Sequence, residues 1–286
     1  MVDIANVSTN ILILGAMYIL VALGFAFIFN MLGIINFAHG AIYMIGGYVG
    51  FLIARSIGVD PWIALLLTTI ILAGFGVFLE KFCLRPFVGD FNSIVMVGVA
   101  ITIIFQTIVN IVAGTKVFTV PPLVTGIFKS GPFAISYGRL LTFAIGIILV
   151  IVVVWFVNRT KRGLQMQAVA QNMEGAALQG VNIHLVSTIA CVLGCGLAAI
   201  SGYLMGSYLS LTPFMGDYML VKVLILVILA GAGSIGGIII TGFILGALNA
   251  ILPILINGAA ADAIAVGIVV VLLLFRPQGF FGHELT

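Results

Sequence analysis

The chain contains very few charged residues. Only 7% of its 286 residues are charged, with eleven Lys and Arg against eight Asp and Glu, whereas 63% are hydrophobic. A soluble domain carries roughly 25% charged residues because its surface must be hydrated. The composition therefore excludes an ordinary soluble protein and indicates a membrane protein whose surface mostly faces lipid. The net charge of +3 is spread along the chain, which excludes a typical nucleic-acid-binding protein.

The residues that catalysis or metal binding would require are also scarce. Cys83, Cys191 and Cys195 have neither a disulfide pattern nor metal-ligand spacing, and we interpret the last two as small packing residues on one helix face. The sequence has no HExxH, no G-x-S-x-G, no paired acids within a span and no Cys–His pair, which argues against a membrane-embedded enzyme. It also lacks G-x-x-x-x-G-K-[ST], so any ATP that drives this protein must be bound, with its magnesium, by another chain. We expect no cofactor and no metal in this chain.

Long apolar runs recur along the whole chain. A spanning helix needs about 20 apolar residues, and runs of this length without period-two alternation predict helices rather than a barrel. We predict an all-α polytopic membrane protein with about eight or nine transmembrane helices, several of them broken by glycine. The candidate spans are 11–29, 40–54, 62–79, 94–114, 140–157, 185–211, 218–232, 236–256 and 262–275. The N-terminus has no basic region and contains Asp3, so 11–29 is expected to be a first span and not a cleaved signal peptide.

Basic residues in short connections predict the orientation. The connections 80–93 and 158–184 are basic, and both should be cytoplasmic. This places the N-terminus outside and "FRPQGFFGHELT" inside, while 115–139, with its prolines and glycines, forms an outer loop. No loop is long enough to bury a core of its own, so residues 1–286 are expected to form a single domain.

The connection 158–184 is predicted to contain a short amphipathic helix. Leu164–Gln179 has no Pro and is rich in Ala, Gln, Leu and Met, with Gly180 placed to end the helix. The apolar face would carry Met166, Val169, Met173 and Ala177, and the polar face Gln167, Gln171 and Glu174. From the residues alone, this helix either rests on lipid headgroups or docks on a partner.

Polar residues within apolar sequence are concentrated in "GIINFAHGAIYMIGGYVG". Polar groups at membrane depth face the bundle interior or a water-filled path, because lipid cannot satisfy them. We expect a break between two spans here, relaxed by Gly33 and Gly40, with Asn36 and His39 capping free backbone groups. A structural hinge beside a pathway is the first interpretation and a substrate-touching site the second. A proton relay or metal ligand at His39 would need a second His or acid, which is not nearby.

Glycines recur in "GAGSIGGIIITGFILG", which includes Gly231, Gly233 and Gly237. They allow close helix packing, or they interrupt a helix so that free N–H groups meet a ligand carboxylate. Asp217, Lys222 and Asp262 lie near span ends, where a surface pair or a snorkelling lysine is expected, with contact to a soluble delivery protein as the alternative.

Three of these segments resemble one protein family. The stretch "RTKRGLQMQAVAQNMEGAALQGVNIH" looks like the cytoplasmic loop of branched-chain amino-acid ABC-transporter permeases. "GIINFAHGAIYMIGGY" and "FRPQGFFG" resemble further motifs of that family in the same order, and the early position of INFAHG is similar to the LivH-type subunit. The later I-x-L-P of the general importer loop is missing.

The resemblance implies a permease subunit of a prokaryotic inner (cytoplasmic) membrane that translocates branched-chain or other hydrophobic amino acids. Its expected partners are a LivM-like second permease, two cytoplasmic ATPase subunits that hold ATP and magnesium, and a soluble periplasmic or extracellular binding protein. The expected alternatives are a urea or short-amide permease of the same family and an ion-coupled carrier, which the scarcity of acids in the spans argues against. Residues assigned by this resemblance to ATPase coupling are Arg162, Gly163, Ala168, Asn172, Glu174, Ala177 and Gly180. Those assigned to the pathway or its hinges are Asn36, His39, Gly40, Gly231, Gly233 and Gly237.

Overall fold

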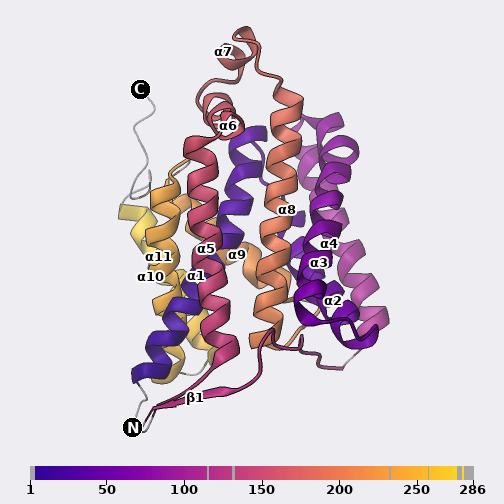
Figure 1. Cartoon of the computed structure of the whole chain (residues 1–286). Coiled ribbons are helices and arrows are strands. Elements are labelled where there is room, and N and C mark those ends of the chain that lie inside the picture. Colours follow the sequence, from indigo (N-terminus) through magenta and orange to yellow (C-terminus); the bar gives the residue numbers. More distant parts are fainter. Residues whose placement is uncertain are drawn as a thin grey trace. The chain divides into compact units, whose positions relative to one another are not determined.

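The computed structural model describes residues 4–114, 116–130, 133–231, 233–256, 258–275 and 279. Nearly all of them are helical, which confirms the all-α class (Figure 1). The α-helices are α1 (Ile4–Leu32), α2 (Ala38–Phe51), α3 (Pro61–Phe78), α4 (Phe91–Ala113), α5 (Tyr137–Arg159), α6 (Lys161–Gln171), α7 (Met173–Leu178), α8 (Ile183–Tyr208), α9 (Met215–Ala230), α10 (Ile235–Leu255) and α11 (Gly258–Phe275). The described sheet is one antiparallel hairpin of β1 (Ile127–Ser130) and β2 (Phe133–Ser136), in the segment predicted as an outer loop.

Each of the predicted spans coincides with a helix. Among the residues that the structure describes, six helical segments are long and apolar enough to cross a membrane: α1, α3 with its extension, α4, α5, α8 and α10. The shorter helices α2, α9 and α11 occupy the remaining predicted spans. The structure thus supports a multi-pass membrane protein.

The chain divides into two compact units. The first contains residues 1–22, 122–150 and 221–286, and the second contains 23–121 and 151–220. Helices α1, α5 and α9 each contribute one part to each unit.

Close backbone contacts between small residues hold the helices of the second unit together. A Cβ on Gly46 would lie 2.7 Å from the carbonyl oxygen of Ala199, and one on Gly24 would lie 2.8 Å from that of Gly194. Gly76 approaches the Cys191 backbone in the same way. Without a hydrophobic driving force in lipid, helix association depends on such close packing. The glycine content therefore positions α8 against α1, α2 and α3.

Glycines also allow close helix contacts in the first unit. Gly246 of α10 lies against the Gly15 backbone of α1, and Gly242 meets the Ile19 side chain one turn further along α1. Gly146 of α5 faces Ala16 and the tip of Met17. These contacts agree with the interpretation of the glycine-rich 231–246 stretch as a packing surface.

The end of α3 changes its winding and shortens the predicted connection 80–93. The π-helix η2 (Leu79–Leu84) and the 3₁₀ turn η3 (Arg85–Phe87) continue α3, so the chain leaves the helix only at Val88. Asp90 then caps α4, accepting hydrogen bonds from the Asn92 and Ser93 N–H groups and from the Ser93 hydroxyl. These donors favour the carboxylate and lower the pKa of Asp90.

The two basic connections lie at the same end of the second unit, as the sequence predicted. Near the start of α8, Thr188 is hydrogen-bonded to Arg85, which belongs to the first connection. At the other end of α8, the Tyr203 hydroxyl donates to the carbonyl of Pro61, at 2.8 Å. The N–H of Val120 donates to the carbonyl of Gly206 beside it. The end of this unit that carries 79–90 and 158–184 is called the basic end below.

Candidate functional site

A tight turn joins α5 to α6 at the basic end. The Thr160 hydroxyl donates to the carbonyl of Phe156 at 2.7 Å and accepts from the N–H of Gly163 at 3.0 Å. A Cβ at Gly163 would collide with the carbonyls of Phe156 and Val157. Only glycine fits there, which gives this predicted coupling residue a structural role in folding α6 back.

The predicted single helix over 164–179 is wrong at Asn172. This residue has φ −155° and ψ 102°, and it both ends α6 and caps α7. Its side-chain oxygen accepts from the N–H of Gly175 at 2.8 Å. Asparagine competes for backbone hydrogen bonds in this manner and so favours caps over helix interiors. The connection therefore carries two short helices.

The break changes which residues face the protein. Met166 and Val169 are buried, as the apolar periodicity predicted. Beyond Asn172 the register is lost, so Met173 and Ala177 are exposed and Ala176 is buried instead.

The chain turns back into α8 through a pair of caps. Gly180 has φ +79°, its N–H donates to the carbonyl of Ala177, and the next N–H, of Val181, donates to that of Ala176. This is the Schellman arrangement that ends helices at a glycine. Asn182 then caps α8 by accepting from the N–H of Leu185 at 3.0 Å. The prediction that Gly180 ends the helix is confirmed.

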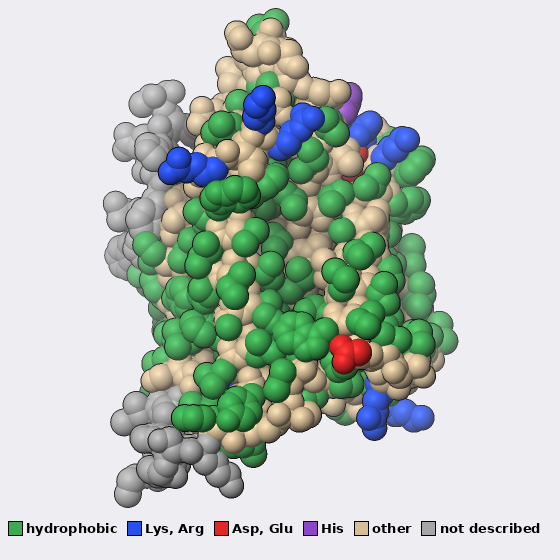
Figure 2. Space-filling view, viewed as in Figure 1, with side chains coloured by type: hydrophobic (Ala, Val, Ile, Leu, Met, Phe, Trp, Pro, Cys, Tyr) green, Lys and Arg blue, Asp and Glu red, His purple; other side chains and the backbone are tan. Residues whose placement is uncertain are grey.

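The predicted coupling residues are all exposed, apart from Gly163, which is buried. Figure 1 places α7 beyond the first turn of α8 and α6 beside that end, and Figure 2 shows Lys and Arg side chains gathered near them. Leu178 is 87% exposed and Met173 is 40% exposed. The coupling surface, as named from here on, consists of Arg162, Ala168, Asn172, Met173, Glu174, Ala177, Leu178 and Gly180. Such a combination of exposed apolar side chains and flanking charge suits docking to a protein partner.

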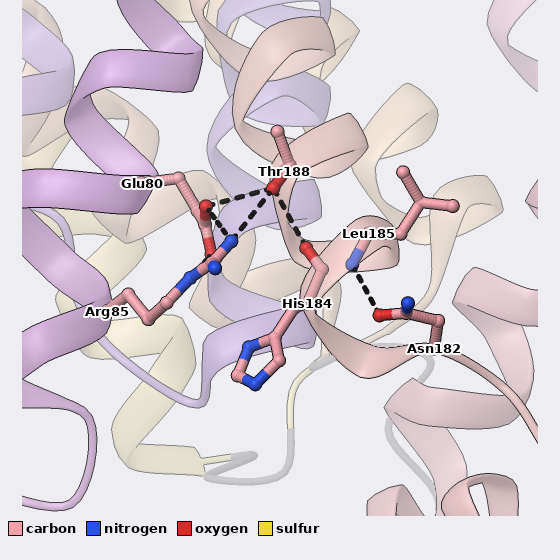
Figure 3. A network of polar contacts seen from close by, with 6 residues as sticks. All are labelled: Glu80, Arg85, Asn182, His184, Leu185 and Thr188. Carbon is pink, nitrogen blue, oxygen red and sulfur yellow. Dashed lines mark hydrogen bonds and ion pairs between the residues drawn. The ribbon is translucent and has the colours of Figure 1, made fainter.

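A polar cluster that the sequence did not predict ties η2 to α8 (Figure 3). The Arg85 guanidinium donates from Nε and from one terminal nitrogen to both oxygens of Glu80, at 2.9 and 2.6 Å. The same terminal nitrogen donates to the Thr188 hydroxyl at 3.2 Å. Glu80 is 1% exposed. Its spacing of five from Arg85 was the available signal, but that spacing pairs two side chains only if the helix is π-wound.

The predicted break in the "INFAHG" segment is present. Gly33, with φ +66°, follows the end of α1, and α2 begins at Ala38. Asn36 is buried, and its side-chain oxygen caps the N–H of Ala38 at 3.1 Å, as predicted, whereas its amide nitrogen has no hydrogen-bond partner among the described residues. His39 is buried edge-on against Phe25, with ring centroids 5.6 Å apart.

Gly40 does not relax the helix, which corrects the expectation for that residue. It lies inside α2, where it and Gly216 of α9 meet backbone to backbone. The close approach requires the absence of a Cβ on both sides. Gly40 is therefore a helix-packing glycine.

Gly231 and Gly233 form the turn between α9 and α10, with φ +86° and +85°. Ser234 caps α10 by accepting from the N–H of Gly237 at 3.0 Å. Within the turn the N–H of Gly231 donates to the carbonyl of Ile228, and that of Ser234 donates to the carbonyl of Gly231. These N–H groups are engaged internally, which favours the packing-and-turn interpretation over ligand binding.

Lys222 is the centre of a second polar cluster, in the first unit. Its ammonium donates to Asp262 at 2.9 Å, to Asn249 at 2.8 Å and to the Tyr18 hydroxyl at 3.4 Å. The Lys222 side chain is 16% exposed and that of Asp262 is 57% exposed. The expected pairing is found, but the lysine is held among four helices and does not snorkel.

The described residues contain no group of three His, Cys, Asp or Glu close enough to hold a metal ion. The fold defines the class as a polytopic α-helical membrane protein, with a pair of short exposed helices at the basic end of the second unit. A solved structure with a related fold is PsaBC from Streptococcus pneumoniae in complex with Fab, with a TM-score of 0.53 and 13% identity over 95% of this chain and 92% of that one.

Sequence comparison gives the family. Residues 7–275 match the family described as "Branched-chain amino acid transport system / permease component", and the chain belongs to it. BraD of Pseudomonas aeruginosa, a high-affinity branched-chain amino acid transport system permease protein, is 29% identical over 96% of this chain and 94% of its own length. LivH of Escherichia coli K12, which bears the same description, is 27% identical over 94% of this chain and 92% of its own length. LivH of Methanocaldococcus jannaschii, described as a probable branched-chain amino acid transport permease protein, is 22% identical. The match covers 93% of this chain and 89% of that protein's length.

Proposed function

We propose that this chain is the transmembrane permease subunit of an ATP-binding-cassette importer for branched-chain or other hydrophobic amino acids. The family match over residues 7–275 carries this proposal. The relatives reported above are named for branched-chain amino acid transport, which does not favour urea or short amides as the substrate.

The proposed assembly places the motor on other chains. Two cytoplasmic ATPase subunits, which bind ATP and magnesium, would meet the coupling surface. A rigid pair of short helices with capped ends passes a rigid-body movement on to the helices that flank it. A LivM-like second permease would complete the pore, and a soluble binding protein would deliver the substrate.

The membrane arrangement follows from the predicted orientation. We propose about eight or nine crossings of a prokaryotic inner membrane, with the basic end in the cytoplasm and residues 1–286 acting as a single permease domain. The hinge and pathway role belongs to the two breaks in the helices. The first break is 33–37, which contains Asn36 and leads into His39 at the start of α2. The second is the turn that contains Gly231 and Gly233 and leads into Gly237 at the start of α10.

The direct test is leucine uptake into vesicles that contain this chain with the ATPases, second permease and binding protein encoded beside it. We expect leucine uptake that requires ATP on the cytoplasmic side of the vesicle membrane. Uptake that follows a proton gradient and ignores ATP would contradict the importer, and uptake of urea or acetamide in place of leucine would contradict the substrate assignment.

The docking role of the coupling surface is tested by Gly180→Leu. A leucine at φ +79° forces the chain out of the Schellman turn, so we expect loss of ATPase co-purification with normal membrane insertion. Gly58→Leu is the matched control, because Gly58 has φ +81°, is equally exposed, has no atom near its absent Cβ and lies at the other end of the second unit. Normal association of Gly180→Leu would remove the coupling assignment.

A further inference from the structure

The polar cluster of Glu80, Arg85 and Thr188 joins two helices beside the coupling surface. Glu80 and Arg85 belong to the end of α3 and Thr188 belongs to the second turn of α8. This cluster is called the clamp. Figure 3 shows the Glu80 carboxylate, the Arg85 guanidinium and the Thr188 hydroxyl meeting in a triangle of contacts.

The π-winding of η2 makes the clamp possible. In a π-helix the backbone hydrogen bond runs from residue i+5 to residue i, and the N–H of Arg85 indeed donates to the carbonyl of Glu80. Residues five apart are then stacked, which brings the guanidinium over the carboxylate as a two-point pair. In an α-helix the same residues would be about 140° apart around the axis. Single π-turns are concentrated at functional sites.

The Thr188 hydroxyl is the only member of the clamp that α8 supplies. It accepts from Arg85 and has a single proton, for which two acceptors compete: Glu80 at 2.9 Å and the carbonyl of His184 at 2.8 Å. Donation to Glu80 ties α8 to α3, whereas donation to His184 stays within α8. The partly exposed hydroxyl can thus donate to either acceptor.

The clamp is separated from the coupling surface by a short and fully capped connection. Between the end of α7 and the start of α8 lie four residues, held by the Gly180 turn and the Asn182 cap. A displacement of α7 therefore reaches the first turns of α8 without a slack loop between them. Thr188 is the first hydrogen-bonded contact on that path to another helix among the residues that the structure describes.

We propose that the clamp is a positioning device for energy coupling, which makes the start of α8 move together with the end of α3 when α6 and α7 are displaced. The inference rests on the proposed function, since it takes the coupling surface as the place where the ATPase acts. Without the clamp, displacement of α7 tilts the start of α8 alone, and ATP is hydrolysed with little transport.

The discriminating variant is Thr188→Val, which removes the hydroxyl with little change in shape and leaves the Glu80–Arg85 pair intact. In the reconstituted full transporter we expect normal ATPase association and near-normal ATP hydrolysis, with leucine imported per ATP reduced by about tenfold, the effect of one hydrogen bond to a charged group. Thr188→Ser, which keeps the hydroxyl, should restore the ratio. Thr69→Val is the matched control, because the Thr69 hydroxyl bonds only to the Leu65 carbonyl within α3.

Glu80→Gln provides a second test in case Thr188→Val reduces the amount of folded protein. It keeps the shape and an acceptor but removes the charge that orients Arg85, and we again expect a lower import-to-hydrolysis ratio. The proposal is overturned if Thr188→Val imports as much leucine per ATP as the parent chain, or if import and hydrolysis fall in equal proportion. Loss of ATPase association in Thr188→Val would overturn it too, because the clamp acts after docking. The docking test at Gly180 is measured by ATPase co-purification, whereas the clamp is tested by the leucine imported per ATP. Failure of one proposal is therefore distinguishable from failure of the other.

Discussion

At the scale of single residues, the glycines of this chain occupy three different environments. Gly40 is needed because another backbone touches it, and Gly180 is needed because its φ is positive. Gly74 of α3 is different, because it is exposed and nothing lies near its absent Cβ. A substitution at each of these positions should therefore change the free energy of unfolding by a different amount or in a different direction, although all three residues are glycine.

We expect Gly40→Ala to lower the free energy of unfolding by about 1–3 kcal/mol, the usual cost of overpacking a tight contact. The added methyl group would collide with the Gly216 backbone of α9. Gly74→Ala, the control, should be neutral or stabilising by up to about 1 kcal/mol, because alanine favours helix. Thermal unfolding in detergent measures both. Equal effects of the two changes would show that the α2–α9 contact is not tightly packed.

At the scale of elements, Lys222 links the helices of the first unit. Lys222 belongs to α9, and its ammonium has three N–H donors. They meet three acceptors on other helices, which are Tyr18 of α1, Asn249 of α10 and Asp262 of α11. The Tyr18 ring also lies 5.5 Å from the ammonium nitrogen. The partly exposed Lys222 charge thus joins four helices, and it must remain compensated because the surroundings are apolar.

We expect Asp262→Leu to destabilise the chain by about 2 kcal/mol, below the 3–5 kcal/mol of a fully buried pair because Asp262 is half exposed. The double variant Lys222→Met with Asp262→Leu should recover most of that loss, since a neutral apolar pair leaves no uncompensated charge. Unfolding by a denaturing detergent gives the values. Asp217→Leu is the control, because that carboxylate is exposed and its partner is the neutral Gln106. A double variant less stable than the single one would contradict the account.

At the scale of the whole molecule, the sequence predicts the distribution of the helices and of the basic end. Hydrophobic length placed a helix at every predicted span, and Lys and Arg marked 80–93 and 158–184 as connections on one side. Capping chemistry also predicted the roles of Gly180 and Asn36.

Other features depend on information that periodicity does not contain. The break at Asn172 arises because a side-chain cap competes with one more turn of helix. The apolar periodicity from Met166 to Ala177 does not show which of the two is more stable. The Glu80–Arg85 pair depends on a local change of winding, and the Lys222 cluster depends on four segments that lie far apart in the sequence. Gly40 shows the same limit, because its partner is 176 residues away.

The orientation in the membrane can be checked with two single cysteines. In inside-out vesicles a membrane-impermeant thiol reagent should label Leu178→Cys and not Gly58→Cys, and in right-side-out vesicles the pattern should reverse. Both positions are exposed, and they lie at opposite ends of the second unit. The parent chain, in which Cys83 is half-buried and Cys191 and Cys195 are buried, gives the background. Labelling of both cysteines from one side would contradict the predicted topology.

The π-turn at Leu79–Leu84 has a genetic consequence. Most surface connections tolerate the gain or loss of a codon, because a loop can absorb one residue. A codon lost between Glu80 and Arg85 would convert the π-turn into an ordinary α-turn, in which the two residues are four apart and could still pair. The residues beyond would keep nearly the same direction, because five π-wound residues and four α-wound residues each complete about one turn. The π-turn therefore absorbs one residue within the helix, as a loop would, with little change in the direction in which the chain enters α4.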